Sequence, residues 1–250
     1  MRDTLVIQSH RSPLPYPWIA RCLASVSDWC ALNQYEYRFL GDELFDGVPG
    51  HLLEKSQEQV VIASDLARLL VLQGALNEGY QTVIWLDADF LIFDPVAFVL
   101  PESPYAVGRE VWVQQDKNDK LKVYKKVHNA LLMFRRGNSF LDFYADTAQR
   151  LLARNQGRVP PQFIGPKLLT AIHNVVVLPV LETAGMLSPL VIKDMLRGEG
   201  PAMDLFVAYS PQPIAAANLC ISSCRNNAVS NREMEQLIDA LPGVSVSQSA

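Results

Sequence analysis

The sequence has no excess of positive charge. It carries 22 Lys and Arg against 26 Asp and Glu, a formal net charge of −4 at pH 7. Proteins that bind nucleic acid without sequence preference usually present a basic surface. The basic stretch 120–126 adjoins Asp116 and Asp119, and we expect it to be a solvated surface loop. Nucleic acid is therefore not an expected partner.

Long hydrophobic runs are also missing. No stretch approaches the roughly 20 apolar residues that span a bilayer. The apolar run Leu5-Val6-Ile7 is too short for the core of a signal peptide, and no small-residue cleavage site follows it. We therefore expect no transmembrane segment and a cytoplasmic location.

Cysteine is scarce, with Cys22, Cys30, Cys220 and Cys224 the only four. In a reducing compartment such residues are usually free thiols that pack as small apolar side chains. The spacing of Cys220 and Cys224 would suit a metal only with a second close Cys or His pair, which the sequence lacks. We expect four buried thiols.

The chain does have enough apolar sequence for a full core. Of its 250 residues 49% are hydrophobic and 19% are charged, which is an ordinary globular balance. We expect a single domain over residues 1–250. The last residues, 244–250, are mainly small and polar, and we expect a flexible tail there.

Hydrophobic periodicity predicts alternating strands and helices. The helix expected at 60–77 is apolar on nearly every side, as buried helices are. This alternation predicts an α/β fold in which helices flank a central sheet, with ligands at the carboxyl ends of the strands. Strands are expected at 5–7, 35–40, 82–86, 105–107, 130–134 and 175–178, and further helices at 18–30, 140–154, 166–173, 189–196 and 232–240.

Two carboxylates, Asp87 and Asp89, directly follow the expected strand 82–86. Because an unpartnered buried charge is costly, such a pair needs a cation or strong hydrogen-bond donors. A divalent cation prefers such oxygen ligands and can bridge the phosphates of a nucleotide. A pair of solvated turn residues is the alternative interpretation.

A second polar pair, Asp65 and Arg68, lies three residues apart on the expected helix 60–77 and so on one face of it. The rest of the helix is apolar, which brings this face close to the core. A ligand-facing pair and a structural ion pair are both consistent with that placement.

The ordered combination of these motifs resembles a known enzyme family. Ser64-Asp65-Leu66-Ala67-Arg68, Gly79-Tyr80, Trp85-Leu86-Asp87-Ala88-Asp89 and Pro95 are similar to the core of the DXD-sugar glycosyltransferases. These include the mannosyltransferase-like enzymes of glycosyltransferase family 32 and, more distantly, the clostridial glucosylating toxins. A weaker similarity continues in two later stretches, His128-Asn129-Ala130 and Gly165-Pro166-Lys167-Leu168-Leu169-Thr170.

The resemblance implies a GT-A-like, Rossmann-type fold with a mostly parallel sheet, and transfer that retains anomeric configuration. The donor would be a nucleotide-diphosphate sugar, UDP- or GDP-linked, and the cofactor Mn²⁺ or Mg²⁺. Asp87 would contact the donor's ribose and sugar, and both Asp87 and Asp89 would bind the metal. Asp65 and Arg68 would hold sugar hydroxyls, and Asn129 would lie beside the reacting centre.

The family's late His or Ser-Trp signature is absent. Asn218 and Ser222 are the nearest oxygen-bearing candidates for further metal ligands, and a polar loop with no part in the site is the alternative. His10 and Arg11 follow the first strand, where the base or ribose of the donor would lie in this architecture.

Two other functions stay open. A sugar-nucleotide-binding protein without turnover would carry the same motifs. A haloacid-dehalogenase-like phosphatase also places Asp-x-Asp after an apolar strand, but it typically carries Thr where this chain has Leu91, and its motif lies near the N-terminus. The acceptor, whether glycan, lipid, small molecule or protein, is not predicted.

Overall fold

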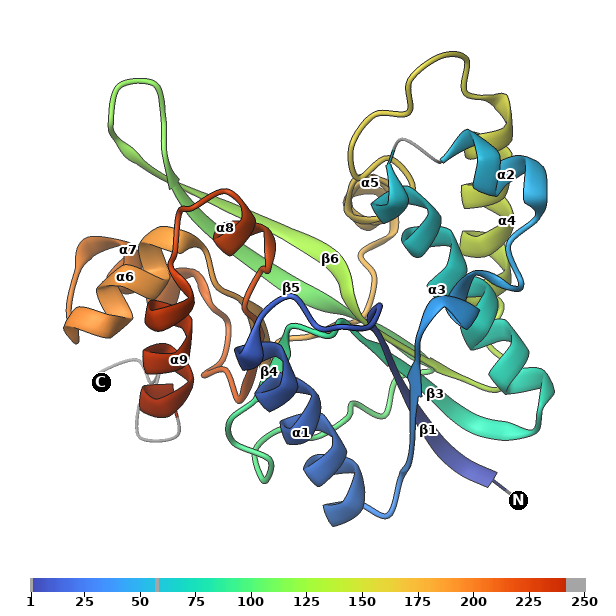
Figure 1. The fold of residues 1–250 in the computed structure, drawn as a ribbon, viewed down its shortest axis with the longest axis horizontal. Helices are drawn as coiled ribbons and strands as arrows, with labels where there is room; N and C mark the ends of the chain where they lie inside the picture. The colour runs from blue at the N-terminus through green and yellow to red at the C-terminus, as the bar shows by residue number, and fades with distance from the viewer. Residues whose placement is uncertain (1, 57–58, 242–250) are drawn as a thin grey trace.

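The computed structural model describes residues 2–56 and 59–241. A six-stranded sheet, with strand order β2-β1-β3-β6-β5-β7, runs through its centre (Figure 1). Its strands are β1 (Arg2–Ser9), β2 (Glu36–Leu40), β3 (Tyr80–Leu86), β5 (Tyr105–Gln115), β6 (Leu121–Arg135) and β7 (Val180–Leu181). A smaller sheet has the order β4-β9-β8, formed by β4 (Phe90–Ile92), β9 (Ala216–Asn218) and β8 (Ala184–Met186).

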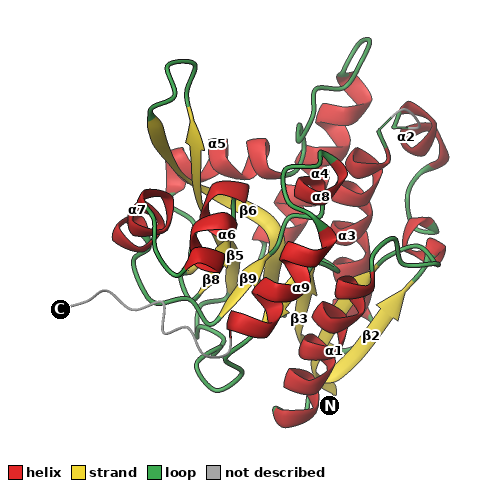
Figure 2. Cartoon of the chain, turned by 60° about the vertical axis from the view of Figure 1, so that its left-hand side comes forward, coloured by secondary structure: helices red, strands yellow, loops and turns green. Residues whose placement is uncertain are grey.

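Helices surround both sheets (Figure 2). They are α1 (Pro17–Leu32), the 3-10 helix η1 (Asp42–Phe45), α2 (Gly50–Lys55), α3 (Val60–Asn77), α4 (Phe140–Arg154), α5 (Pro166–Val176), α6 (Pro189–Arg197), α7 (Pro201–Tyr209), α8 (Ser222–Arg225) and α9 (Asn231–Ala240).

The strand directions confirm a mostly parallel sheet. β1 is parallel to β2 and β3, and β5 is parallel to β7, whereas β6 is antiparallel to its neighbours β3 and β5. Because β6 runs against β3, its Leu131 pairs with Leu86 at the carboxyl end of β3. The backbone N–H of Asp87 then donates to the carbonyl of Ala130 at 2.9 Å. The residues of β6 just before Leu131 therefore meet the residues that follow β3.

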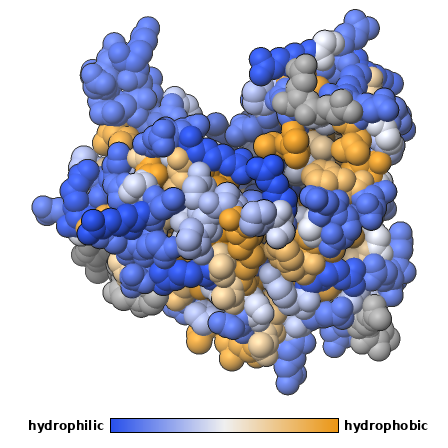
Figure 3. Space-filling view, in the orientation of Figure 1, coloured by the Kyte–Doolittle hydropathy of each residue, from blue (hydrophilic) through white to orange (hydrophobic). Residues whose placement is uncertain are grey.

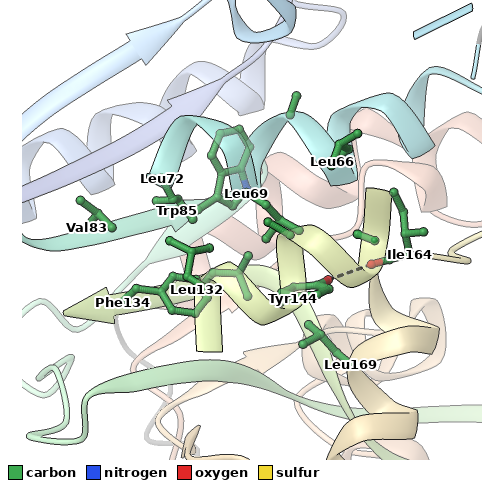
Figure 4. Packing of buried hydrophobic residues seen from close by; sticks show 14 of the residues in the cluster. Leu66, Leu69, Leu72, Val83, Trp85, Leu132, Phe134, Tyr144, Ile164 and Leu169 are labelled. Atoms are coloured by element: carbon green, nitrogen blue, oxygen red, sulfur yellow. Dashed lines mark hydrogen bonds between the residues drawn. The ribbon is translucent and has the colours of Figure 1, made fainter. Parts of the chain in front are cut away.

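Both faces of β3 are covered, as its continuous apolar run predicts. One face packs against α3 and α4, and Figure 4 shows part of this cluster. On the other face, Ile84 belongs to a cluster with Val26 and Trp29 of α1. The Tyr144 hydroxyl of α4 donates to the Ile164 carbonyl at 3.0 Å, which ties α4 to the segment before α5. The labelled side chains of the first cluster are Leu66, Leu69, Leu72, Val83, Trp85, Leu132, Phe134, Tyr144, Ile164 and Leu169.

The helix α3 is, among the described residues, the one helix long and apolar enough to span a membrane by length and composition. Half of its 18 residues are buried inside the fold. It packs against β3 and α4 and carries Asp65 and Arg68, which are 2% and 6% exposed. This is the pattern of a core helix.

Two local predictions were wrong. The stretch 120–126, expected to be a loop, is mostly strand, because Leu121 starts β6 and pairs with Gln115 of β5 in a long hairpin. The stretch 175–178, expected to be a strand, instead ends α5, and Val177 closes that helix with a left-handed φ of 47°. The run of valines favours a strand locally, but the helix begun at Pro166 continues through Val176. The expected tail, 244–250, lies outside the described residues.

The four cysteines are free and buried, which confirms that expectation. Burial raises the pKa of the Cys30 thiol to about 12 and raises the pKa of the Cys220 thiol well above its usual value. These thiols are therefore uncharged apolar packing groups rather than nucleophiles.

Candidate active site

An open cavity of about 660 Å³ lies at the carboxyl end of β3. The start of α3 and the segment before α5 form one side of it, the β5–β6 hairpin another, and the segment from β9 to α8 a third. Figure 3 shows the molecule hollowed beside the protruding hairpin. The predicted residues Asp65, Arg68, Asp87, Asp89, Asn129, Asn218 and Ser222 all line this cavity, from four separate parts of the chain.

Arg68 holds Asp87 in place. Its Nη1 donates to Asp87 Oδ1 at 2.8 Å and to the Asn129 carbonyl at 2.8 Å. Trp85 Nε1 donates to the same Asp87 oxygen at 2.7 Å. The guanidinium also lies over the Trp85 ring, 5.1 Å from its centroid. Charge-assisted bonds of this kind are short and directional, so they fix the orientation of the Asp87 carboxylate at the cavity wall.

Asp65 joins the same network through Asn129. Asn129 Nδ2 donates to Asp65 Oδ1 at 2.7 Å, and Arg68 Nη2 lies 3.4 Å from that oxygen. Among the described residues, Asp65 Oδ2 has no hydrogen-bond partner although it is buried. Burial raises the pKa of Asp65 to about 6, against the opposing effects of Arg68 and Asn129. A buried carboxylate oxygen without a donor is costly, and this residue lines the cavity.

Asp89 is bound by the C-terminal segment. Asn218 Nδ2 donates to its Oδ1 at 2.7 Å, and the Ile221 backbone N–H donates to its Oδ2 at 2.7 Å. The Asn218 Oδ1 in turn accepts from the Cys220 N–H at 2.8 Å. Burial, and then the charge of Asp87, raises the pKa of Asp89 to about 6. The segment that sequence similarity left undefined is therefore anchored on the second aspartate of Asp-x-Asp.

The oxygen atoms of Asp87 and Asp89 fit a divalent cation that takes its remaining ligands from a substrate. Within residues 2–56 and 59–241, no group of three or more His, Cys, Asp or Glu side chains is placed to hold a metal. Asp87 and Asp89 line one cavity, and the charge of Asp87 opposes ionisation of Asp89. A cation bound between them would relieve this repulsion, and ions such as Mg²⁺ often use one or two carboxylates plus phosphates and water. An all-protein metal cage does not fit.

His128 lies on the cavity wall as a neutral ring. Its Nδ1 accepts from the Ala130 N–H at 3.0 Å, which places the proton on Nε2, and Nε2 has no partner among the described residues. Burial lowers the pKa of His128 to about 3, although the Arg109 backbone opposes this shift. Gly108 lies directly against the ring, because a Cβ there would be 2.2 Å from its Cε1.

Sequence reasoning missed several residues of the cavity wall. Trp112, Tyr124 and Lys126 come from the β5–β6 hairpin, and Arg225 comes from α8. The hairpin residues could have been found from the two-residue spacing of side chains that share one face of a strand. It was hidden because 120–126 was expected to be a loop.

The structure does not bring His10 and Arg11 to this cavity wall. Both follow the carboxyl end of β1, where Arg11 is exposed, and neither is among the residues that line the cavity. The end of β1 is nonetheless linked to the site, because Gln8 Nε2 donates to the Asp87 carbonyl at 3.0 Å. Their contact with the donor base or ribose stays a prediction.

Comparison of the sequence with protein-family models and with curated proteins gave no match. Among solved structures, the fold is similar to that of a glycosyltransferase involved in the glycosylation of the major capsid of PBCV-1. The TM-score is 0.50 at 12% identity, over 94% of this chain and 98% of that chain. This chain has a GT-A-like fold. At this identity the similarity concerns the fold alone.

Two more solved structures are more distant. A197 from STIV gives a TM-score of 0.28 at 17% identity over 57% of this chain and 68% of that one. The 4-diphosphocytidyl-2C-methyl-D-erythritol synthase from Anaerococcus prevotii gives 0.32 at 10% identity over 71% and 86%. Superpositions this loose carry no argument.

The close approach of Gly165 to the network gives a first prediction. A Cβ at this position would lie 2.5 Å from Asp65 Oδ2 and 2.9 Å from Asn129 Nδ2. Gly165→Ala should therefore displace the pair and lower the free energy of unfolding by about 1–3 kcal/mol, the usual cost of overpacking. Urea denaturation measures this. The control is Gly74→Ala, where a Cβ meets nothing within 4 Å and helix propensity predicts a small gain. Equal stability of Gly165→Ala and wild type would contradict the packing described here.

The buried neutral His128 gives a second prediction. Its pKa is about 3 in the folded state and 6.5 in the reference state, so the unfolded chain binds the extra proton as the pH falls below 6.5. This residue therefore lowers stability on acidification, by at most about 1.4 kcal/mol per pH unit. His128→Gln should lose this dependence. The shifts of Asp65 and Asp89 have the opposite sign, but they are present in both proteins and cancel in the difference. Parallel stability curves for the two proteins between pH 7 and pH 4 would refute the assignment.

Proposed function

We propose that this protein is a glycosyltransferase that moves a sugar from a UDP- or GDP-linked donor to an acceptor. The observation that carries the proposal is the buried network of Asp65, Arg68, Asp87 and Asn129, which opens on the cavity beside Asp89. Polar residues at this depth are expensive to bury, and their place at the carboxyl end of a parallel strand is where α/β folds bind ligands. The fold similarity to a viral glycosyltransferase supports the same class.

In this proposal Asp87 and Asp89 would hold Mn²⁺ or Mg²⁺, with Ser222 as a further oxygen ligand. Asn218, proposed from the sequence as another ligand, would have to turn its amide, because its Nδ2 donates to Asp89 and its Oδ1 accepts from the Cys220 N–H. A bound cation of this kind neutralises the charge that develops on a departing diphosphate. Two protein cations, Lys126 and Arg225, line the same cavity and would attract the diphosphate. Because Arg68 already bonds to Asp87, it orients that carboxylate rather than contacting the phosphates.

The donor sugar would lie against Asp65 and Asn129. Both side chains line the cavity, and we propose that a sugar hydroxyl contacts this pair. Arg68 contacts Asp65, Asp87 and the carbonyl of Asn129, so it holds the groups around the reacting centre in one arrangement. Such positioning lowers the activation barrier, because the reacting groups are already oriented and lose less entropy in the transition state. We propose that the transfer retains anomeric configuration, and that His10 and Arg11 contact the base or ribose.

The segment from Asn218 to Arg225 would exclude water from the reacting centre. It is tied to Asp89 by two hydrogen bonds to the carboxylate and one to the backbone carbonyl, and Ser222 and Arg225 from α8 line the cavity. Exclusion of water strengthens the charge interactions inside a site and limits hydrolysis of the donor. We do not propose the phosphatase, because Leu91, which stands where that family carries Thr, is 4% exposed and packs in the core.

A third prediction tests the paired aspartates. Asp87→Asn keeps the Oδ1 that accepts from Arg68 and Trp85 but removes the charge. Donor turnover, assayed with UDP-glucose and GDP-mannose in Mn²⁺, should fall by about 10²–10³-fold, as when a preorganised electrostatic contact is lost. The variant should stay folded, because Asp65 still faces the Arg68 guanidinium, and its melting temperature is measured on the same preparation. Asp89→Asn should lose turnover as well.

The matched control is Asp146→Asn, whose carboxylate is 59% exposed in an ion pair with Arg150 on α4. It should keep wild-type turnover. Full activity of Asp87→Asn, or of the wild type after thorough chelation, would remove the support for a metal-dependent transferase. Binding of donor by the wild type without any turnover would favour the sugar-nucleotide-binding protein.

A fourth prediction separates the two roles of Asp65. If Asp65 holds a sugar hydroxyl, Asp65→Asn should lower kcat/KM at least about tenfold while the protein stays folded, because transition-state contacts are lost. If Asp65 is only half of a structural ion pair with Arg68, the variant should melt earlier and keep its specific activity. Thermal denaturation and donor turnover measured on the same preparation distinguish these outcomes.

A further inference from the structure

The β5–β6 hairpin has two different faces. Val111 and Val113 are 1% exposed and belong to a core cluster with residues of α6 and α7. The opposite face lines the cavity beside the acidic centre. In the strand register Trp112 pairs with Tyr124 and Glu110 with Lys126, so these side chains stand in adjacent rows on one face. The residues of this face that line the cavity are Glu110, Trp112, Gln114, Tyr124 and Lys126.

Trp112 is exceptional among the four tryptophans. Trp18, Trp29 and Trp85 are at most 2% exposed, whereas Trp112 is only half-buried and its partner Tyr124 is 37% exposed. The Trp112 Nε1 donates to Gln114 Oε1 at 3.1 Å. The Lys126 ammonium lies 5.2 Å from the centroid of the Tyr124 ring. The cavity wall therefore carries two aromatic rings that are partly exposed.

We infer that this aromatic pair and its polar neighbours bind a sugar ring of the acceptor, so that the acceptor is a carbohydrate. This inference rests on the proposed glycosyl transfer. A pyranose has a face of C–H bonds, which suits aromatic rings, and a rim of hydroxyls, which needs donors and acceptors. The Gln114 amide supplies donors and the Glu110 carboxylate supplies acceptors around the rings.

The shape of the hairpin supports an extended acceptor. It projects from the body of the protein in both ribbon views (Figures 1 and 2). A terminal sugar on Trp112 would lie in the same cavity as Asp65 and Asn129, while later sugars of the glycan would leave along the exposed end of the hairpin. A nucleobase also stacks on aromatic rings, but it does not need the carboxylate of Glu110, whose pKa burial raises.

The test is saturation-transfer NMR with methyl hexopyranosides and the disaccharides maltose, cellobiose and lactose, with and without UDP and Mn²⁺. Wild type should bind at least one of these probes. Trp112→Ala should bind that probe about tenfold more weakly, at the upper end of a ring-stacking contact, and Trp112→Phe should recover part of the affinity. Tyr209→Ala is the matched control, because Tyr209 is 50% exposed and lies outside the cavity lining.

Two outcomes overturn the inference. In the first, wild type binds none of the glycosides under either condition. In the second, Trp112→Ala binds them as wild type does. If that variant also loses UDP, the aromatic pair is a site for the donor base. Glycoside binding is measured without turnover, so it does not depend on the donor assay. Loss of donor turnover in the wild type would count against the proposed function, whereas loss of glycoside binding alone would count against this inference.

Discussion

The buried guanidinium of Arg68 is the interaction on which the rest of the site depends. It contacts two carboxylates, Asp65 and Asp87, and the carbonyl of Asn129. These groups come from α3, from the end of β3 and from β6, so one side chain connects the core helix to two neighbouring strands. Removing one partner of such a buried set typically costs about 3–5 kcal/mol, because a charge is left uncompensated. The same residue therefore fixes the fold and the geometry of the cavity wall.

The buried network carries more negative than positive charge. Asp65, Asp87 and Asp89 face one buried arginine, and the pKa values of Asp65 and Asp89 are both raised to about 6, mainly by burial. A cation and a ligand rich in hydroxyls would offset the cost of burying these carboxylates. The raised pKa values therefore agree with the proposed use of the site. The two walls of the cavity are correspondingly different, with the carboxylates on one side and the aromatic and basic hairpin on the other.

Much of this arrangement was predictable from the sequence. The helix 60–77, the buried strand before Asp87 and the shared face of Asp65 and Arg68 follow from apolar periodicity, and the structure has all three. The meeting of Asn129 with Asp65 was expected only through family resemblance. Its physical cause is the antiparallel pairing of β6 with β3, which no local pattern reveals.

The hairpin was missed for a related reason. Lysines at 120, 122, 125 and 126 suggested solvent, and these side chains do stay largely in solvent, but Leu121, Val123 and Val127 alternate with some of them and hold the strand on the core. The valines at 175–177 misled in the opposite direction, because helix α5 extends through two of them. In the hairpin tertiary packing outweighed the local pattern. Val175 and Val176 are 81% and 60% exposed, so packing of their side chains does not explain the end of α5.

The most direct test of the central claim is the anomalous difference density of Mn²⁺ in crystals grown with UDP or GDP. The account predicts a peak in the cavity beside Asp87 and Asp89, together with density for the diphosphate next to it. A nucleotide bound at another surface, or manganese density absent from this cavity while the nucleotide occupies it, would contradict the account.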